Sequence, residues 1–304
     1  MACETWCVSE REAPTVDQAA RDIETMEVRG AAKIARHAAS ALGRLASEGA
    51  DADELREAGQ RLIATRPTAV SLQNGVRYVL AGLDDGPEVV EARSQRFVHD
   101  ALRARERVAR NGARLLEGVD VAMTHCHSQA AATSLIARHD REPFEAVIVL
   151  ETRPWRQGLI TAEQLADAGL PVEFMVDAAM GRALERAEVA IVGVDTIAAN
   201  GDVVNKIGTS LVSLAAEEAD VPFYVAGESF KVDPGSATGH DVEIEERDPA
   251  EVLEDPIAGV EVVNPVFDVT PADRIAQLAL EAGRFAPEEA LDVFERSWGG
   301  LDGA

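Results

Sequence analysis

The sequence predicts an α/β protein in which a helical N-terminal domain, residues 1–116, precedes a domain with a mainly parallel sheet, residues 117–304. Two observations carry this prediction. Apolar residues recur with a period near 3.6 between residues 15 and 115, where no strand-like run interrupts them. From about residue 118, short apolar runs of strand length alternate with helical stretches, which is the pattern of a parallel sheet covered on both faces.

Five helices are expected in the first domain. Their apolar periodicity covers residues 16–30, 31–49, 51–65, 71–83 and 88–117. The third helix should end before Pro67, because a residue that precedes proline avoids the helical backbone conformation. The first domain is therefore expected to contain helices and no sheet.

Five strands are expected in the second domain, at residues 120–126, 145–151, 171–177, 189–195 and 222–228. Helical stretches separate most of them, at residues 128–140, 161–169, 179–187 and 209–219. We interpret residues 232–259 as rich in loops and residues 287–304 as a short helix with a glycine-rich end.

Polar residues follow each of the five predicted strands. They are Cys126, Glu151-Thr152-Arg153, Asp177, Asp195 and Glu228. In open parallel sheets, ligands bind outside the carboxyl ends of the strands. We therefore expect the active site at this rim.

The chain is strongly acidic, with a formal net charge of -25, and its acidic residues are spread along the whole sequence. Together with scarce lysine and abundant alanine, this pattern predicts adaptation to high salt, where a Debye length of about 3 Å at 1 M screens self-repulsion. The charge argues against nucleic-acid binding, because no stretch rich in Lys and Arg exists to follow a phosphate backbone.

No run of 18 apolar residues occurs, so no membrane span is expected, and the N-terminus lacks a signal-peptide pattern. We therefore predict a cytoplasmic protein. Cys3, Cys7 and Cys126 are odd in number and lack metal-site spacing, so neither a disulfide framework nor a metal site is expected.

Lysine is rare: only Lys33, Lys206 and Lys231 occur, each inside a compact motif (RGAAKIA, NKIGT and ESFKVDP). An ammonium group on a flexible stem suits a phosphate oxygen. The motifs therefore indicate a site for phosphorylated ligands. Asn205 beside Lys206, before a predicted helix, suits a sugar hydroxyl and a phosphate.

The segment THCHS places Cys126 between His125 and His127 at a strand end. Neighbouring cations and the start of the next helix lower a thiol pKa, which favours a general base or nucleophile. The structural alternative is a buried cysteine that acts as a small apolar residue. A metal site on the two histidines is conceivable, but no complementary cluster of His or Cys follows.

Asp195, in GVDTI, also stands at a strand end and suits a general acid if partly shut away from water. The alternative is a capping aspartate. Arg29 with Gly30, and Arg66 before Pro67, suit one phosphate each, although an interdomain salt bridge would explain the arginines equally well.

Seven motifs occur in order across almost the entire chain: RGAAKIA, TRPTAVSLQN, THCHS, ETRPWRQG, GVDTIAANGDVVNKIGT, VEIEERDP and NPVFDVTP. They resemble the superfamily of translation initiation factor 2B regulatory subunits and aldose-1-phosphate isomerases. Within it, they are most similar to the archaeal ribose 1,5-bisphosphate isomerases. The resemblance implies a helical domain followed by a Rossmann-like domain, and a homohexamer built from dimers.

The resemblance also implies a reaction, the conversion of α-D-ribose 1,5-bisphosphate into ribulose 1,5-bisphosphate in nucleotide degradation, with AMP as an activator and without a cofactor. Cys126 would be the proton acceptor and Asp195 the proton donor. The implied substrate contacts are Arg29, Gly30, Ala31, Ala32, Arg66, Ser128, Gln129, Ala130, Asn205, Lys206 and Lys231. Some relatives carry Lys where this chain has Gln129, which is expected to weaken one phosphate contact.

Two alternatives stay open. Methylthioribose 1-phosphate isomerases share the Cys and Asp pair but need an apolar pocket in place of the second phosphate site, whereas this chain has Arg29, Arg66, Lys206 and Lys231. Non-catalytic regulatory subunits generally lack the pair, which this chain has.

Overall fold

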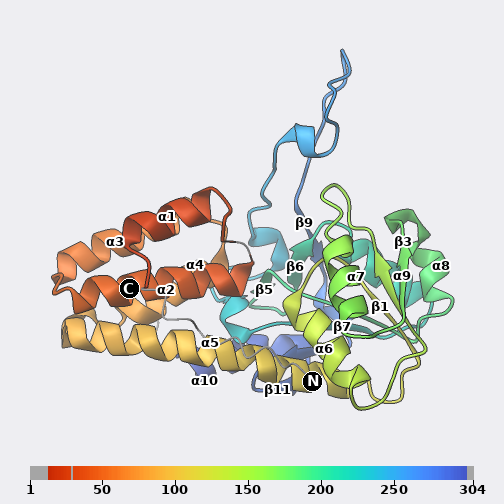
Figure 1. Ribbon diagram of the computed structural model, residues 1–304, viewed down its shortest axis with the longest axis horizontal. Helices are drawn as coiled ribbons and strands as arrows, with labels where there is room; N and C mark the ends of the chain where they lie inside the picture. The colour runs from red at the N-terminus through yellow and green to blue at the C-terminus, as the bar shows by residue number, and fades with distance from the viewer. Residues whose placement is uncertain (1–12, 29, 300–304) are drawn as a thin grey trace. The chain divides into compact units, whose positions relative to one another are not determined.

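The chain divides into two compact units, seen in a computed structural model that describes residues 13–28 and 30–299 (Figure 1). Within the described residues, the helical unit holds residues 13–28, 30–67 and 72–99, and the sheet unit holds 68–71 and 100–299. The boundary between the two units lies inside one long helix, between His99 and Asp100. The boundary that we expected at residues 116 and 117 stays a prediction.

The predicted helices of the first unit are confirmed. They are α1 (Val16–Glu24), α2 (Ala31–Ser47), α3 (Ala52–Thr65), α4 (Val70–Leu80) and α5 (Pro87–Leu115), with a 3-10 turn η1 at Leu83–Asp85. The first helix is shorter than expected, because Thr25 caps its C-terminus and Met26 has a φ of 60°. Asp51 and Glu54 form a capping box that begins α3, and α3 ends before Pro67 as expected. Leu42, Leu55 and Leu62 are fully buried.

The sheet unit contains a seven-stranded sheet in the order β11-β10-β7-β4-β1-β2-β3. Five strands match the prediction: β1 (Val121–Thr124), β2 (Ala146–Leu150), β3 (Val172–Met175), β4 (Val189–Val192) and β7 (Phe223–Ala226). These strands are all parallel; β10 (Gln277–Leu280) continues the parallel set, and β11 (Gly283–Phe285) is antiparallel to it. The α/β fold with a mainly parallel sheet is therefore confirmed.

Helices follow most strands of this sheet, as the alternating pattern predicts. They are α6 (Gln129–His139), α7 (Gly158–Asp167), α8 (Met180–Leu184) and α9 (Thr209–Glu218), with 3-10 turns between some of the elements and α10 (Ala290–Trp298) near the end of the chain. The core contains β1, β2 and β4, all of whose residues are buried, together with apolar side chains of α6 and the end of α5. Among the described residues, no helix combines the length and apolarity needed to cross a membrane.

A second, four-stranded sheet was not predicted from the sequence. It has the order β8-β5-β6-β9, formed by β8 (Val232–Asp233), β5 (Thr196–Ala198), β6 (Val203–Lys206) and β9 (Phe267–Thr270). Its strands are two to four residues long, and polar residues such as Asn205 in β6 and Asp268 in β9 interrupt them, so no apolar run marks these strands in the sequence. The sheet matters for the site because β5 begins directly after Asp195 and β6 ends at Lys206.

Candidate active site

The two candidate catalytic residues follow neighbouring strands. Cys126 lies two residues after β1, Asp195 lies three residues after β4, and β1 and β4 pair in parallel. Their carboxyl ends therefore lie at one edge of the sheet, as the sequence predicted. Cys126 is 7% exposed, and Asp195 is partly buried.

The backbone at Cys126 has a φ of 66°, a left-handed conformation that a non-glycine residue adopts only where its surroundings hold it. The Cys126 N–H donates to Thr152 Oγ1 at 2.8 Å. The Thr152 hydroxyl lies 3.3 Å from His125 Nδ1, and His125 Nε2 lies 3.1 Å from the Ile207 carbonyl. Because a carbonyl only accepts, the proton of His125 is on Nε2, and Nδ1 accepts from Thr152.

Burial lowers the pKa of His125, so its imidazole is neutral at neutral pH and fits this chain of bonds. Asp177, one of the polar residues predicted at the rim, accepts the backbone N–H groups of Thr152 at 2.7 Å and Arg153 at 2.8 Å. Asp177 therefore fixes the turn that supports Cys126. Its role in this structure is to orient the backbone.

The thiol of Cys126 is strongly desolvated. Burial raises its pKa to about 12, and this effect outweighs the ammonium of Lys206, which lowers the pKa; the carboxyl of Asp195 raises it further. Sγ lies 3.6 Å from Gln157 Oε1, which accepts from the thiol. The expectation of a lowered thiol pKa is wrong for this structure. The loss of water destabilises the thiolate more than the nearby positive charge stabilises it.

His127 contacts different partners from His125. Its Nδ1 lies 3.0 Å from Thr161 Oγ1, whose own proton goes to the Cys126 carbonyl at 2.8 Å, so Nδ1 donates. Nε2 then accepts from Gln129 Nε2 at 3.1 Å, and burial lowers the pKa of His127, in keeping with a neutral ring. The two histidines therefore do not share a face, and β1 ends before both.

A metal site on these histidines is not supported by this geometry. Both rings are committed to hydrogen bonds within the loop. Across residues 13–28 and 30–299, no group of three or more His, Cys, Asp or Glu side chains is arranged to hold a metal ion.

Ser128, Gln129 and Ala130 begin helix α6. Ser128 is the N-cap, and its Oγ accepts the Ala131 N–H at 3.3 Å, while the N–H groups of Gln129 and Ala130 precede the first intrahelical bond. Gly193, after β4, approaches closely, since a Cβ there would overlap Ser128 Oγ. Gln129 is exposed, and its amide bridges His127 and Gln164. This helix end is suited to an anion.

Asn205 and Lys206 stand at the end of β6 and are both buried. Asn205 donates to Thr209 Oγ1 at 2.9 Å, which ties the strand end to the start of α9. The Lys206 ammonium lies 5.1 Å from the centre of the Phe267 ring, and it forms no hydrogen bond or ion pair within the described part of the chain. Burial lowers the pKa of Lys206, and nearby Cys126 and Asp195 raise it.

Lys231 is equally buried, but its ammonium is occupied. It donates to the Val194 carbonyl at 2.8 Å and lies 3.1 Å from Glu228 Oε2. The geometry to Glu228 is that of an ion pair rather than an aligned hydrogen bond, because Oε2 has no hydrogen-bond partner. Val194 precedes Asp195, so this buried pair supports the loop that carries the candidate acid.

The remaining candidates belong to the helical unit. Gly30 is the N-cap of α2, where its φ of 88° suits glycine, and Ala31 and Ala32 form the first turn. Arg66 is the C-cap of α3. Arg29 lies outside the described residues. Because these residues are in the other unit, their approach to Cys126 stays a prediction.

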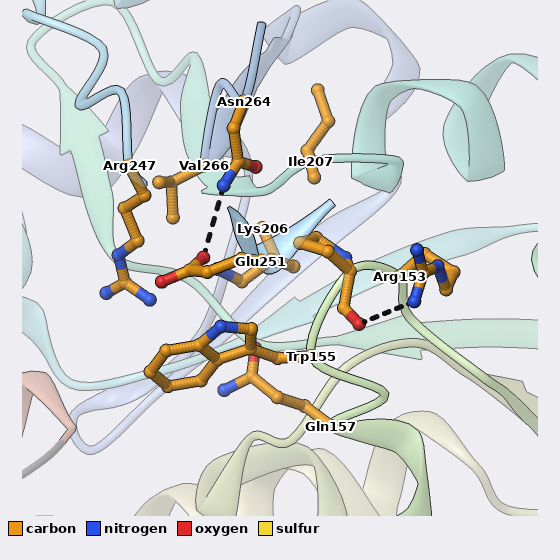
Figure 2. Close-up of a pocket in the computed structure, with 10 residues that line it drawn as sticks. Arg153, Trp155, Gln157, Lys206, Ile207, Arg247, Glu251, Asn264 and Val266 are labelled. Carbon is orange, nitrogen blue, oxygen red and sulfur yellow. Dashed lines mark hydrogen bonds between the residues drawn. The ribbon is translucent and has the colours of Figure 1, made fainter. Parts of the chain in front are cut away.

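A pocket of about 230 Å³ in the sheet unit was missed by sequence reasoning (Figure 2). The residues that line it are Arg153, Pro154, Trp155, Gln157, Lys206, Ile207, Arg247, Glu251, Asn264 and Val266. Trp155 lines this pocket and is 36% exposed. The motifs ETRPWRQG and VEIEERDP contain its two arginines, but nothing in their order along the chain shows that they meet.

The sequence profile of the Initiation factor 2 subunit family matches residues 27–287. The chain belongs to this family. Six archaeal family relatives named ribose 1,5-bisphosphate isomerase are 40% to 44% identical to it. The protein of that name from Haloterrigena turkmenica is 44% identical over 94% of this chain and 95% of its own.

Other relatives carry different names. The methylthioribose-1-phosphate isomerase of Klebsiella pneumoniae is 34% identical over 93% of this chain and 88% of its own. The crystal structure of the Pyrococcus horikoshii OT3 translation initiation factor eIF-2B superposes with a TM-score of 0.80 at 31% identity, covering 91% of this chain and 98% of that one. Relatives that share this fold therefore carry names that refer to more than one function.

Proposed function

We propose that this chain is an isomerase that converts α-D-ribose 1,5-bisphosphate into D-ribulose 1,5-bisphosphate. The observation that carries the proposal is the pair of Cys126 and Asp195 at the ends of adjacent strands, with the Lys206 ammonium acting on the same thiol. The names of the six archaeal relatives reported above support this substrate over methylthioribose 1-phosphate.

The substrate requires an acid and a base at different atoms. Its C1 phosphate prevents formation of a free aldehyde, so the ring opens with the phosphate in place. Asp195 gives a proton to the ring oxygen as the bond between C1 and that ring oxygen breaks. The Cys126 thiolate then takes the proton from C2. The electron pair of the C2–H bond forms the C1–C2 double bond of an enol phosphate.

Collapse of the enol completes the reaction. The C2 hydroxyl returns its proton to Asp195 as the C2 carbonyl forms, and Cys126 returns the proton that it holds to C1. Hydrogen is only redistributed within the sugar, so the step needs no external oxidant or reductant. Burial of the thiol, with Gln157 at hydrogen-bond distance from Sγ, keeps competing water away from the enol phosphate.

The phosphates need cationic and N–H donors around this pair. In the sheet unit, the start of α6 at Ser128, Gln129 and Ala130, and the side chains of Asn205 and Lys206, are arranged to supply them. Lys231 and, from the helical unit, Arg29 to Ala32 and Arg66 are proposed as further substrate contacts. For Lys231, contact requires that substrate compete with Glu228 and the Val194 carbonyl.

The proposal extends to the setting of the enzyme. We extend the proposal to a homohexamer and to activation by AMP, both of which the family resemblance supports, and to a cytoplasmic location. These three features are checked by light scattering, by turnover with and without AMP, and by fractionation of the source cells.

The experiment that tests the function follows ribulose 1,5-bisphosphate formation in high salt with AMP present. Cys126→Ser and Asp195→Asn should each lower kcat by about 10²- to 10⁴-fold, the usual worth of a positioned acid or base. Asp167→Asn, at the exposed end of α7, and Cys7→Ser, at a residue outside the described range, are matched controls that should keep wild-type activity.

Turnover of methylthioribose 1-phosphate alone would move the assignment to that reaction. Inertness of the wild type towards both substrates would point to a regulatory subunit without catalytic activity. Full activity of both site variants would remove Cys126 and Asp195 from the mechanism while leaving the substrate in place.

A further inference from the structure

The pocket beside Lys206 gathers positive charge in a chain whose formal net charge is -25. Arg153, Lys206 and Arg247 line it, against the single carboxylate of Glu251. Even when Glu245, the partner of Arg247, is counted, three cations face two carboxylates. Such an excess of positive charge among the lining residues favours the binding of an anion.

Arg247 is oriented before any ligand binds. Its guanidinium carbon lies 4.9 Å from the centre of the Trp155 ring, and its Nε donates to Glu245 Oε1 at 3.1 Å. Stacking and the single bond at Nε fix the plane of the group, which leaves its two terminal nitrogens as the fork that binds phosphate or carboxylate oxygens. The Arg247 side chain is only 14% exposed.

Arg153 and Lys206 provide the other positive charges. Figure 2 shows Arg153 and Arg247 on opposite sides of the pocket in that view. Arg153 donates to the Pro154 and Val252 carbonyls at 3.1 and 3.0 Å, bonds to neutral acceptors that leave its charge uncompensated. Lys206 has no ion pair within the described residues. Glu251, by contrast, already accepts from Asn264 Nδ2 at 3.2 Å.

The pocket lies beside the candidate catalytic group. Its space of about 230 Å³ includes volume that is open to solvent. One of its lining residues, Gln157, also accepts from the Cys126 thiol at 3.6 Å. It therefore suits one charged group of a ligand whose reacting carbons lie at Cys126.

We propose that this pocket binds one of the two phosphate groups of the sugar bisphosphate, with Arg247 and Arg153 as specificity-determining residues. The proposal rests on the proposed function, since it assigns a subsite of the same reaction. A monophosphate whose only phosphate lies elsewhere would leave the two arginines unused. The pocket thus selects a bisphosphate over a sugar that carries an apolar group at the other end.

The test compares binding of three ligands to the full-length chain by calorimetry: ribulose 1,5-bisphosphate, ribulose 1-phosphate and ribulose 5-phosphate. Arg247→Gln and Arg153→Gln should each weaken binding of the bisphosphate by about 10- to 100-fold, the worth of a charge-assisted hydrogen bond. They should weaken one monophosphate by a similar factor and leave the other unchanged, which identifies the phosphate in the pocket.

Arg182→Gln on α8 is the matched control, because it removes the same charge from an exposed position paired with Glu185. Arg247→Lys should recover part of the lost affinity if charge as well as geometry matters. Unchanged affinity of both pocket variants for all three ligands, or an equal loss for all three, would overturn the proposal.

Turnover by the wild type is measured in parallel to separate the two failures. If the wild type does not convert ribose 1,5-bisphosphate, the proposed function fails whatever the variants bind. If the wild type is active and Arg247→Gln and Arg153→Gln both keep its affinities and KM, only the phosphate pocket fails. Arg153 is an exposed side chain at the rim, so its variant remains informative even if Arg247→Gln does not fold.

Discussion

Lys206 and Lys231 are both buried in the sheet unit, yet their surroundings differ. Lys231 is 7% exposed, forms an ion pair with Glu228 and donates a hydrogen bond to the Val194 carbonyl. Lys206 is 9% exposed and faces the Phe267 ring and an open pocket, with no ion pair among the described residues. The same residue type therefore serves the fold at one position and is available to a ligand at the other.

This difference shows how a lysine that stabilises the fold can be distinguished from a lysine that is available to bind a ligand. A buried ammonium that is paired with a buried carboxylate stabilises its neighbours. Removal of one partner leaves the other as a buried charge without a counter-charge. A buried ammonium without a partner costs stability in the free protein, because it has lost water without gaining a counter-charge. Stability and affinity measurements should therefore respond in opposite ways at the two lysines.

The largest effect is expected from Lys231→Met. Glu228, which is 4% exposed, would be left as a buried charge without its cation, and the free energy of unfolding should fall by about 3–5 kcal/mol. Denaturant unfolding measures this change. The double variant Glu228→Gln with Lys231→Met should recover much of the loss, since neither charge then remains.

Unchanged stability of Lys231→Met would show that the Glu228 pair contributes little. The comparison would then reduce to two lysines that are equally free to bind substrate.

A smaller effect is expected from Lys206→Met, and it should appear in ligand affinity rather than in stability. Affinity for ribulose 1,5-bisphosphate should fall by about 10- to 100-fold, that is about 1.5–3 kcal/mol, through loss of a charge-assisted bond. The free energy of unfolding should stay the same or rise, because an unpaired buried charge has been replaced by an apolar side chain. Calorimetry and denaturant unfolding on one preparation check both, and a loss of stability without loss of affinity would contradict this account.

The smallest effect is expected in the reactivity of the Cys126 thiol, which reports how each lysine acts on it. Its pKa is raised to about 12, so thiolate is the minor form at neutral pH, and its fraction should increase about tenfold per pH unit. The rate of Cys126 alkylation by iodoacetamide, followed by peptide mass, should rise with that slope.

Lys206 lowers the thiol pKa, so Lys206→Met should raise it further and slow alkylation at every pH, whereas Lys231→Met should not. The Cys126→Ser variant reports alkylation of the other cysteines. A rate that levels off near pH 8 would mean that the thiol is far more acidic than its burial implies.

Local patterns in the sequence determined much of the fold. The 3.6-residue period marked the helices, and five apolar runs marked the parallel strands, because both signals arise between residues close in sequence. Cys126 and Asp195 were predicted at one rim for the same reason: strand ends in a parallel sheet point one way. The strands of the second sheet were not predicted, because polar residues such as Asn205 and Asp268 interrupt them and no apolar run marks them.

Tertiary structure alone decided how these residues behave. Burial reversed the expected shift of the Cys126 pKa, because desolvation depends on everything packed around the sulfur. Lys231 pairs with Glu228 and donates to a carbonyl that follows another strand, while Lys206 has no ion pair within the part of the chain that the structure describes. Arg247 meets Trp155 only through the fold. Sequence thus specified which groups are present at the site, whereas charge, exposure and pairing arose from contacts between residues far apart in the chain.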